Sequence, residues 1–172
     1  MTENISDDIL TPQGKFAAGA GAARWRPRLA ETLEKIAEAA AQFDDEWWVI
    51  GSAAAALVGA EILEARDVDL LLSARDARAL VKRWADAAAT PPAPSDRFRS
   101  AVFARFDCAP LPIEAFGGFE MKLRGDWREV RPLTRVAHGK IFTPSIAEQI
   151  ALLEAMGREK DRPRVEALRA LF

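Results

Sequence analysis

The chain has 172 residues, of which 49% are hydrophobic and 29% are charged, a balance that excludes a wholly disordered chain and is ordinary for a soluble globular protein. Its 24 basic and 26 acidic residues give a net charge of -2, so we expect no strong general attraction to nucleic acid, although a local basic patch is compatible with these counts. The length suits one domain that needs neither a disulfide nor a structural metal.

The features that report on location favour the cytoplasm. The single cysteine, Cys108, cannot form an internal disulfide, which is typical of a reducing compartment. The start of the chain, Met1 to Asn4, is acidic and polar and lacks the basic and apolar regions of a secretory signal. No apolar run approaches the ~20 residues of a membrane span. We therefore predict a cytoplasmic protein without a membrane segment.

The first half of the chain predicts a helix, then two buried strands with a short helix between them. Residues 1–22 lack apolar periodicity and are expected to form a flexible arm before a single domain at 23–172. The first helix should begin near Pro27, because apolar residues then recur at three- and four-residue steps up to Phe43. The next elements are predicted at Trp47–Ile50 (strand), Ala53–Val58 (helix of small residues) and Asp67–Leu72 (strand).

The second half predicts antiparallel strands followed by two helices. A helix at Arg75–Ala88 should stop at the prolines of residues 91–94, which indicate a surface loop. Alternation along Phe98–Phe106 places its even-numbered residues on one face, and the segment Ile113–Phe116 should form a neighbouring antiparallel strand. Further strands are predicted within Trp127–Val136 and at Lys140–Phe142, and the final helices at Ser145–Met156 and Lys160–Leu171.

These elements predict an α/β or α+β fold, in which helices flank a small mixed β-sheet and a C-terminal helical pair covers one side of a cleft. In the last helix, Val165, Leu168 and Leu171 should share the inward face. The only histidine, His138, lies in a predicted turn, and nothing near it indicates a Cys/His metal site or a nucleophilic triad.

The most informative feature is a set of three carboxylates on two predicted strands. Asp67 and Asp69 are separated by one apolar residue, so their side chains point to the same face of a strand, with Cα atoms ~6.6 Å apart. Glu114 lies among apolar neighbours, where a charge without a partner would be costly. Sites of phosphoryl transfer hold two Mg²⁺ ions ~3.5–4 Å apart, and three such carboxylates can converge on them.

The segment before these carboxylates suits the phosphates of a substrate. Gly51 lets the backbone approach closely, the Ser52 hydroxyl can donate a hydrogen bond, and the following helix directs its positive N-terminus at phosphate. The same two residues also suit a plain strand-to-helix turn with Ser52 as the cap. The two interpretations are compatible with each other.

The carboxylates have structural interpretations too. Glu120 or Asp107 could take the place of Glu114 if the strand boundaries move by a few residues. The two aspartates could cap a turn or pair with Arg66 or Arg75 instead of binding metal. Both alternatives remain open at the level of the sequence.

A glycine-serine turn, an Asp-x-Asp strand with apolar flanks and a later lone strand carboxylate, in this order, resemble the nucleotidyltransferase superfamily with its polymerase-β-like core. The resemblance implies that Asp67, Asp69 and Glu114 hold Mg²⁺ and act in catalysis. It also implies that Gly51 and Ser52 contact the phosphates of the bound nucleotide.

The C-terminal segment is similar to small bacterial members related to the abortive-infection nucleotidyltransferase toxins. There, a lysine and an aspartate near the start of the last helix lie at the active site, and Lys160 and Asp161 match them. The resemblance assigns Lys160 to catalysis, and Asp161 and Arg158 to nucleotide binding. By residue type alone, Lys160 and Asp161 also suit the first turn of a solvated helix.

The resemblance covers about residues 45–170 and implies a Mg²⁺-dependent transferase, which moves a nucleoside monophosphate from a nucleoside triphosphate such as ATP to a hydroxyl of an RNA end, a protein or a small molecule. The second hypothesis is an inactive binding module on the same fold, for example a toxin-antitoxin component with a protein partner. Leu153 stands where related proteins often carry a lysine, and Ala53 to Ala56 lack the arginine of some antitoxin members, which favours the module. The intact carboxylates favour the enzyme.

Overall fold

The structure is a computed structural model that describes residues 22–89 and 95–172. The expected arm, apart from Ala22, and the proline-containing loop at 91–94 fall outside the described residues. The helices are α2 (Ala22–Ala40), α3 (Gly51–Leu57), α4 (Ala74–Arg83), α5 (Ile146–Met156) and α6 (Arg162–Arg169), with 3-10 turns η1 (Ala85–Ala87) and η2 (Glu159–Asp161). The strands are β1 (Trp48–Ile50), β2 (Val68–Leu72), β3 (Ala88–Ala89), β4 (Phe98–Phe106), β5 (Ile113–Leu123), β6 (Asp126–Glu129), β7 (Val136–His138) and β8 (Ile141–Thr143). Within the described ranges, no helix is both long and apolar enough to cross a membrane.

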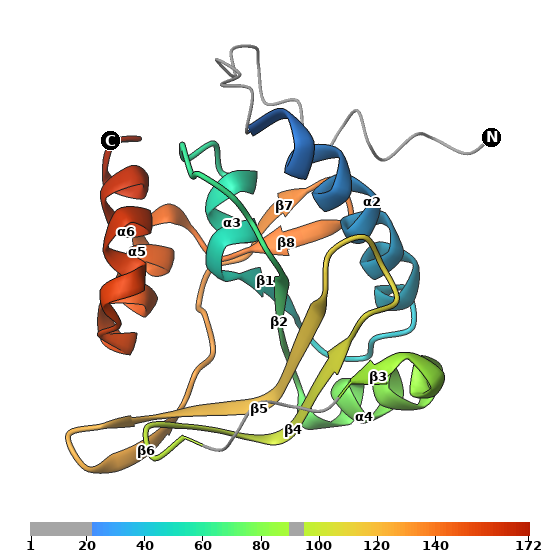
Figure 1. The fold of residues 1–172 in the computed structure, drawn as a ribbon. Coiled ribbons are helices and arrows are strands. Elements are labelled where there is room, and N and C mark those ends of the chain that lie inside the picture. Colours follow the sequence, from blue (N-terminus) through green and yellow to red (C-terminus); the bar gives the residue numbers. More distant parts are fainter. Residues whose placement is uncertain (1–21, 90–94) are drawn as a thin grey trace.

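A curved mixed sheet forms the centre of the fold (Figure 1). Its strands lie in the order β1-β2-β5-β4-β3, and β6 pairs with the far end of β5. β2 and β5 run parallel, whereas the other neighbours in this sheet are antiparallel. β7 and β8 form a separate two-stranded ribbon. The predicted mixed sheet with flanking helices is confirmed, and so is the antiparallel pairing of β4 with β5.

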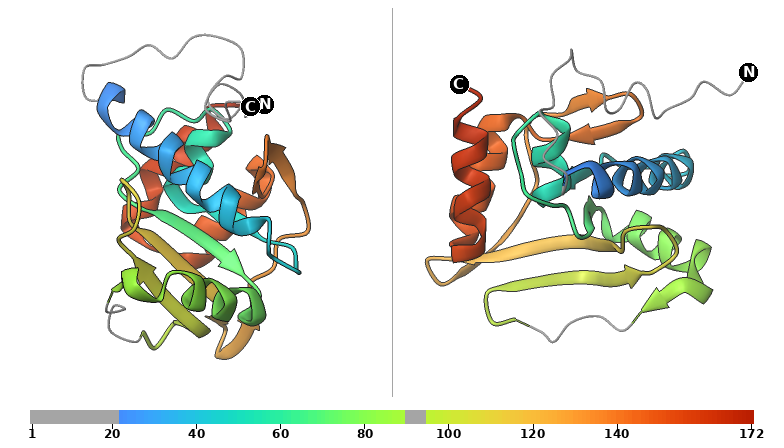
Figure 2. Two further views of the ribbon diagram at one scale, coloured as in Figure 1. Left: turned by 90° about the vertical axis from the view of Figure 1, so that its right-hand side faces the viewer. Right: turned by 45° about the horizontal axis from the view of Figure 1, so that its top comes forward.

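One face of the sheet is covered by α2 and α4, which lie toward the viewer in the left view of Figure 2. The apolar stripe of α2 buries Leu29, Leu33 and Ile36 in one cluster with Leu70 of β2 and Ile113 of β5. Because successive side chains of a strand point to opposite faces, the residues next to Leu70 and Ile113 point away from this core. The sequence neighbours of these two residues are two of the predicted carboxylates.

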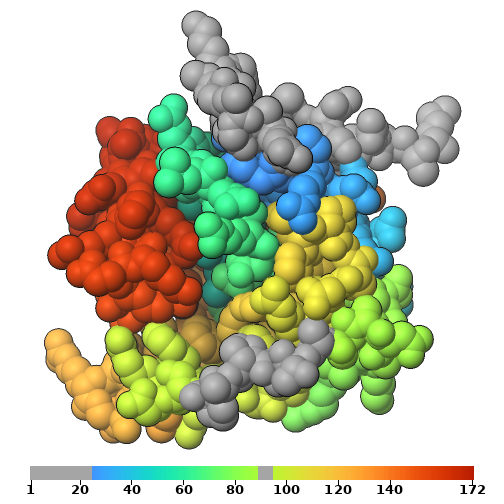
Figure 3. Space-filling view, viewed as in Figure 1, coloured from blue at the N-terminus to red at the C-terminus, as the bar shows by residue number. Residues whose placement is uncertain are grey.

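The C-terminal helices pack on α3 and lie beside the segment that follows it (Figure 3). Leu153 of α5, together with Val165 and Leu168 of α6, forms a cluster with Ala55 of α3, whose small side chain lets the helices approach closely. The predicted helical pair is therefore confirmed. The inward position expected for Leu171 is wrong, because α6 ends two residues earlier and Leu171 is 40% exposed.

The long pair β4 and β5 changes the phase of its side chains at Gly118. Ile113 belongs to the core beneath α2 and α4, whereas Phe119, also odd-numbered on β5, belongs to a second cluster with residues of α5. Gly118 has a φ of +62°, a conformation that L side chains rarely adopt, and it rotates the strand between these residues. The prediction that Phe98 and Phe106 share one face is therefore wrong, since Phe106 lies in the first core and Phe98 packs against the second cluster.

Two helices differ from their predicted lengths. α2 begins at Ala22 rather than near Pro27, which lies inside the helix and costs it one hydrogen bond because proline has no N–H. α4 ends at Arg83 rather than Ala88, because Trp84 leaves the helical conformation and η1 follows.

The predicted strands of the second half also have different ends. β5 runs from Ile113 to Leu123 rather than to Phe116, through two glycines that resemble a turn in the sequence. β6 covers only Asp126–Glu129, and residues 130–135 form no strand. The longer β5 matters because it carries aromatic side chains beyond the carboxylates.

A candidate metal and nucleotide site

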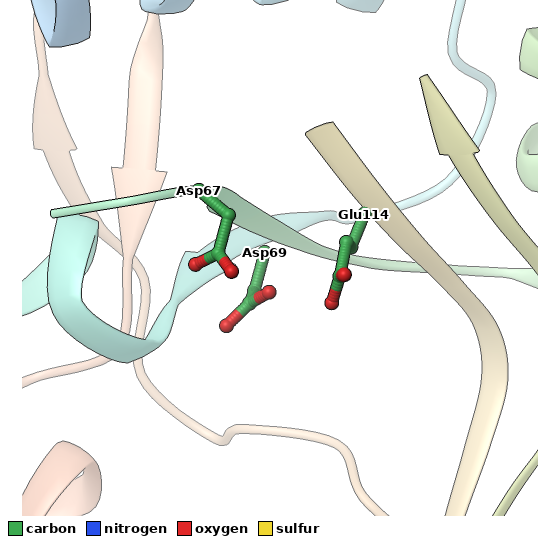
Figure 4. A group of neighbouring side chains, drawn as sticks. All are labelled: Asp67, Asp69 and Glu114. Atoms are coloured by element: carbon green, nitrogen blue, oxygen red, sulfur yellow. The ribbon is translucent and has the colours of Figure 1, made fainter. Parts of the chain in front are cut away.

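The structure brings together the three carboxylates that were predicted to meet. Asp67 precedes β2, Asp69 lies within it, and Glu114 lies near the start of β5. One carboxylate oxygen of each lies within 4.8 Å of those of the other two, and all three residues are partly exposed. Figure 4 shows the three side chains projecting to the same side of the two strands. The parallel register places Asp69 beside Glu114.

Burial and the neighbouring negative charges change the protonation of Asp69. Burial is the main cause that raises its pKa to about 8, and the charges of Asp67 and Glu114 act in the same direction, whereas Arg164 and Arg158 act against it. In the absence of metal, this carboxyl group therefore tends to hold a proton near neutral pH. A divalent cation among the three oxygens would replace that proton.

Glu114 also has an arginine partner on the neighbouring strand. Nη1 of Arg105 donates a hydrogen bond to Oε1 of Glu114 over 2.7 Å, at the position where β4 pairs with β5. This bond fixes the orientation of the carboxylate and occupies one of its two oxygens. Within the described part of the chain, no ion pair involves Asp67 or Asp69.

The alternatives that the sequence left open are occupied elsewhere. Each of the charged residues considered has an ion partner that is not one of the three carboxylates. These pairs are Arg66 with Glu64, Arg75 with Asp44 and Asp45, Glu120 with Arg99, and Asp107 with Arg105. The arginines therefore do not neutralise the two aspartates, and the other acids do not replace Glu114 in the cluster.

Gly51 lies against the carboxylate of Asp69. It follows β1 directly, begins α3 and has a φ of +70°. A Cβ atom at this position would lie 2.6 Å from Oδ2 of Asp69, closer than real Cβ atoms come to a neighbour. The positive φ favours glycine here, and a Cβ atom would displace the carboxylate of Asp69. The close approach that the sequence predicted for a phosphate is, in this structure, an approach to a carboxylate.

Ser52 lies in the first turn of α3 and is only 3% exposed. The helix cap is Ile50, with no side-chain hydrogen bond, so the suggestion that Ser52 caps the helix is wrong. Gly51 lines the pocket described below, whereas Ser52 is not among its lining residues.

Basic groups approach the carboxylates from the segment between α5 and α6 and from the first turn of α6. Asp161 is 1% exposed, and its carboxylate accepts hydrogen bonds from Nε of Arg158 at 2.6 Å and from Nη1 of Arg164 at 2.8 Å. Both arginines are close enough to lower the pKa of Asp69 by their charge. Asp161 thus holds two guanidinium groups beside the cluster. Sequence reasoning missed Arg164, for which the only signal is its spacing of three residues from Asp161.

A pocket of about 630 Å³ includes the carboxylates in its wall. Pockets of this size with a mainly apolar lining and a few polar groups are typical of small-molecule sites. The polar lining residues are Asp67, Asp69, Ser95, Arg99, Ser100, Glu114, Gln149, Arg158 and Lys160. The apolar ones are Ile50, Phe98, Phe103, Phe116, Phe119, Leu152, Leu153 and Met156. Gly51 completes the lining, so the predicted residues Gly51, Arg158 and Lys160 share one pocket with the carboxylates.

Comparison with known proteins supports the fold. No protein-family profile matches the sequence, and no curated protein matches it. The structure is similar to the crystal structure of a "putative nucleotidyltransferase" from Thermotoga maritima, with a TM-score of 0.63 and 20% sequence identity over 81% of this chain and 89% of that chain. At this identity the similarity shows a nucleotidyltransferase-like fold, and the function must be argued from the site. The closer resemblance to abortive-infection toxins stays a prediction.

Proposed function

We propose that the protein is a Mg²⁺-dependent nucleotidyltransferase, which transfers a nucleoside monophosphate from a nucleoside triphosphate to an acceptor hydroxyl and releases pyrophosphate. The observation that carries this proposal is the convergence of Asp67, Asp69 and Glu114 within 4.8 Å in the wall of a pocket. The name of the Thermotoga maritima protein supports the same class of activity.

The residues of the cluster fit Mg²⁺. This ion prefers carboxylate oxygens and keeps several water molecules, and the cluster offers three partly exposed carboxylates beside a pocket. The raised pKa of Asp69 fits the same role, because a carboxylate that is buried beside like charges gains most from a cation. When bound, Mg²⁺ would offset the charge of the triphosphate and orient it for in-line displacement.

Glu114 is the candidate for proton transfer. Its carboxylate would accept the proton of the acceptor hydroxyl as the oxygen attacks the α-phosphate. The hydrogen bond from Arg105 at 2.7 Å keeps one carboxylate oxygen in place and leaves the other for the proton or the metal. Asp67 and Asp69 would hold the metal from the neighbouring strand β2 and the residue before it.

The triphosphate would lie between α3 and the segment after α5. Lys160 and Arg158 line the pocket, and both carry the positive charge that the β- and γ-phosphates require. Asp161 positions Arg158, so we assign it a positioning role in nucleotide binding. Gly51 remains our candidate for phosphate contact at the start of α3, whereas Ser52 is buried outside the pocket lining. The four nucleoside triphosphates, ATP included, are equal candidates.

A thermal-shift titration tests the proposal. We expect wild-type protein to be stabilised by a nucleoside triphosphate only when Mg²⁺ is present, and we expect the Asp67→Asn/Asp69→Asn double variant to lose this stabilisation. Asp126→Asn, an exposed acid on β6, is the matched control and should keep it. Stabilisation that persists in the double variant, or that needs no metal, would contradict the proposal.

The inactive module has one observation in its favour. Leu153 occupies the position of the expected lysine, is 4% exposed and packs with α6. Lys160 nevertheless supplies a basic group to the same pocket, and the three carboxylates are intact. The enzyme is therefore the better-supported hypothesis, and a titration without any nucleotide response would favour a binding module with a protein partner, as in a toxin-antitoxin pair.

A further inference from the structure

Four phenylalanines form an aromatic wall in the pocket that contains the carboxylates. The rings of Phe103 and Phe116 meet edge to face across β4 and β5, with centroids 4.9 Å apart. Phe116 contacts Phe119 at 5.4 Å, and Phe98 stacks on Phe119 at 6.1 Å. All four line the pocket. Such a wall gains free energy when an apolar group displaces water from it.

This aromatic wall begins beside Glu114. Phe116 follows Glu114 by two residues on β5, and both line the pocket. Their partners on β4 are Phe103, opposite Phe116, and Arg105, opposite Glu114. A molecule whose hydroxyl reaches the carboxylate of Glu114 therefore has its carbon skeleton against Phe103 and Phe116.

Arg158 and Lys160, the cations proposed to hold the triphosphate, lie on a different part of the chain from the aromatic wall. Arg158 and Lys160 follow α5, whereas the wall is formed by β4 and β5. In-line displacement requires the attacking hydroxyl and the departing pyrophosphate to lie on opposite sides of the α-phosphate. If the triphosphate is held by these cations, the part of the pocket that β4 and β5 line, which meets α5 at Met156, is left for the acceptor.

In the described pocket lining, Arg99 is the one basic residue that β4 and β5 supply, which disfavours a nucleic-acid acceptor. Arg105 is bound by Glu114, and Arg99 is bound by Glu120 and stacks on the ring of Trp127 at 4.2 Å. An RNA end would bring several phosphates, and each of them gains from a nearby cation. The net charge of -2 supplies no general attraction either.

From this arrangement we infer that the acceptor is a small, uncharged molecule that carries its hydroxyl on an aromatic or aliphatic skeleton, which packs on Phe103 and Phe116. The inference rests on the proposed function. Of its three candidate acceptors, an RNA end, a protein and a small molecule, it selects the small molecule. Transfer would form a bond between the acceptor oxygen and the α-phosphorus, break the bond to the β-phosphate oxygen and pass the hydroxyl proton to Glu114, with pyrophosphate as the leaving group.

A neutral fluorescent probe, N-phenyl-1-naphthylamine, tests the inference in binding experiments. We expect saturable binding to the wild-type protein that persists when Mg²⁺ and an α,β-methylene nucleoside triphosphate are bound. Ser100→Trp should fill the pocket from β4 and weaken probe binding by at least tenfold, because Ser100 lines it. Ala101→Trp is the matched control, since Ala101 is the next residue of β4, is exposed and does not line the pocket. It should bind the probe as the wild type does.

A second variant, Phe103→Ser, removes one ring of the aromatic wall instead of filling the pocket and should also weaken probe binding. For every variant, the thermal shift with Mg²⁺ and nucleotide reports whether the fold and the nucleotide site are intact. An RNA hexanucleotide is added in a separate arm, and we expect it not to displace the probe from the nucleotide-bound protein.

The outcomes separate this inference from the proposed function. Nucleotide binding without probe binding overturns the inference and leaves the proposed function standing. Mutual exclusion of probe and nucleotide overturns it as well, because the aromatic wall would then hold the nucleobase. Displacement of the probe by the hexanucleotide overturns it in favour of a nucleic-acid acceptor. Absence of a nucleotide response overturns both.

Discussion

Asp69 and Glu114, 45 residues apart in the sequence, are direct neighbours on two parallel strands. The register of β2 and β5 therefore builds the candidate metal site, and the carboxylates face the pocket because their sequence neighbours Leu70 and Ile113 are buried in the core on the other face. The site thus depends on the same alternation that forms the core, and a change at either acid need not disturb the packing.

Replacement of Glu114 by glutamine should reduce catalysis while leaving the fold intact. We expect the release of pyrophosphate from a nucleoside triphosphate, measured with cell extract as the source of acceptor, to fall by about 10²–10⁴-fold, because a general base is lost. Glu120→Gln on the same strand is the control, since Glu120 pairs with Arg99 outside the cluster. Equal losses in both variants would show that Glu114 has no special role.

The stability of the metal-free protein should fall as the pH rises from about 4 to about 8. The pKa of Asp69 is raised to about 8 in the folded protein, against ~3.9 for an unfolded chain, so over this window the folded state holds a proton that the unfolded state has released. We expect urea unfolding in EDTA to show a decline in the free energy of unfolding that is absent in Asp69→Asn. An unchanged decline in the variant would assign it to other groups.

Mg²⁺ should act against this pH dependence. Binding requires the deprotonated carboxylate, so the increase in Tm on addition of Mg²⁺ should be larger at pH 8 than at pH 6, with release of a proton on binding. The measurement is a Tm titration with Mg²⁺ at both pH values, with Asp69→Asn as the variant that should show neither the increase nor its pH dependence. A Mg²⁺ effect of equal size at both pH values would argue against Asp69 as a ligand.

Gly51→Ala should impair metal binding, whereas Gly59→Ala should not. Both glycines have a positive φ, so alanine should cost each about 1–3 kcal/mol of stability. Only at Gly51 would the new Cβ meet Asp69, at 2.6 Å from Oδ2, while nothing lies within 4 Å at Gly59. We therefore expect the Mg²⁺-dependent increase in Tm to be lost in the first variant and kept in the second. Equal behaviour of the two variants would contradict the close approach.

The convergence of the carboxylates could be predicted because it depends on short-range rules. The i, i+2 spacing of Asp67 and Asp69 fixes them on one face of a strand, and the order of elements suggests that the strand of Glu114 is a neighbour. The glycine-serine turn was visible for the same reason. What Gly51 contacts could not be predicted, because that depends on how closely β1 packs on β2.

The aromatic wall could not be predicted from the sequence. Simple alternation separates Phe116 from Phe119, and only the positive φ of Gly118 brings both to the pocket. The sequence offers two adjacent glycines, Gly117 and Gly118, and no pattern tells which one adopts this conformation.

The arginine partners of the acids were missed for a related reason. Arg105 meets Glu114 only in one register of β4 and β5, and that register is set by the whole pair of strands. Arg164 meets Asp161 across one turn at the start of α6, which is one of many charged pairs that the spacing allows. Sequence spacing indicates such pairs but does not rank them.

The positions of Arg158 and Arg164 should depend on Asp161. It is 1% exposed and hydrogen-bonded to both arginines, so Asp161→Asn leaves two guanidinium groups without their counter-charge. Because the arginines are partly exposed, we expect the free energy of unfolding to fall by about 1–3 kcal/mol. Glu159→Gln is the matched control, because its pair with Arg162 is exposed and should contribute less than about 1 kcal/mol. Urea unfolding measures both costs. Because Arg158 would lose its orientation toward the pocket, we also expect weaker binding of the nucleoside triphosphate in Asp161→Asn. Normal nucleotide affinity in this variant, together with the expected loss of stability, would limit Asp161 to a structural role.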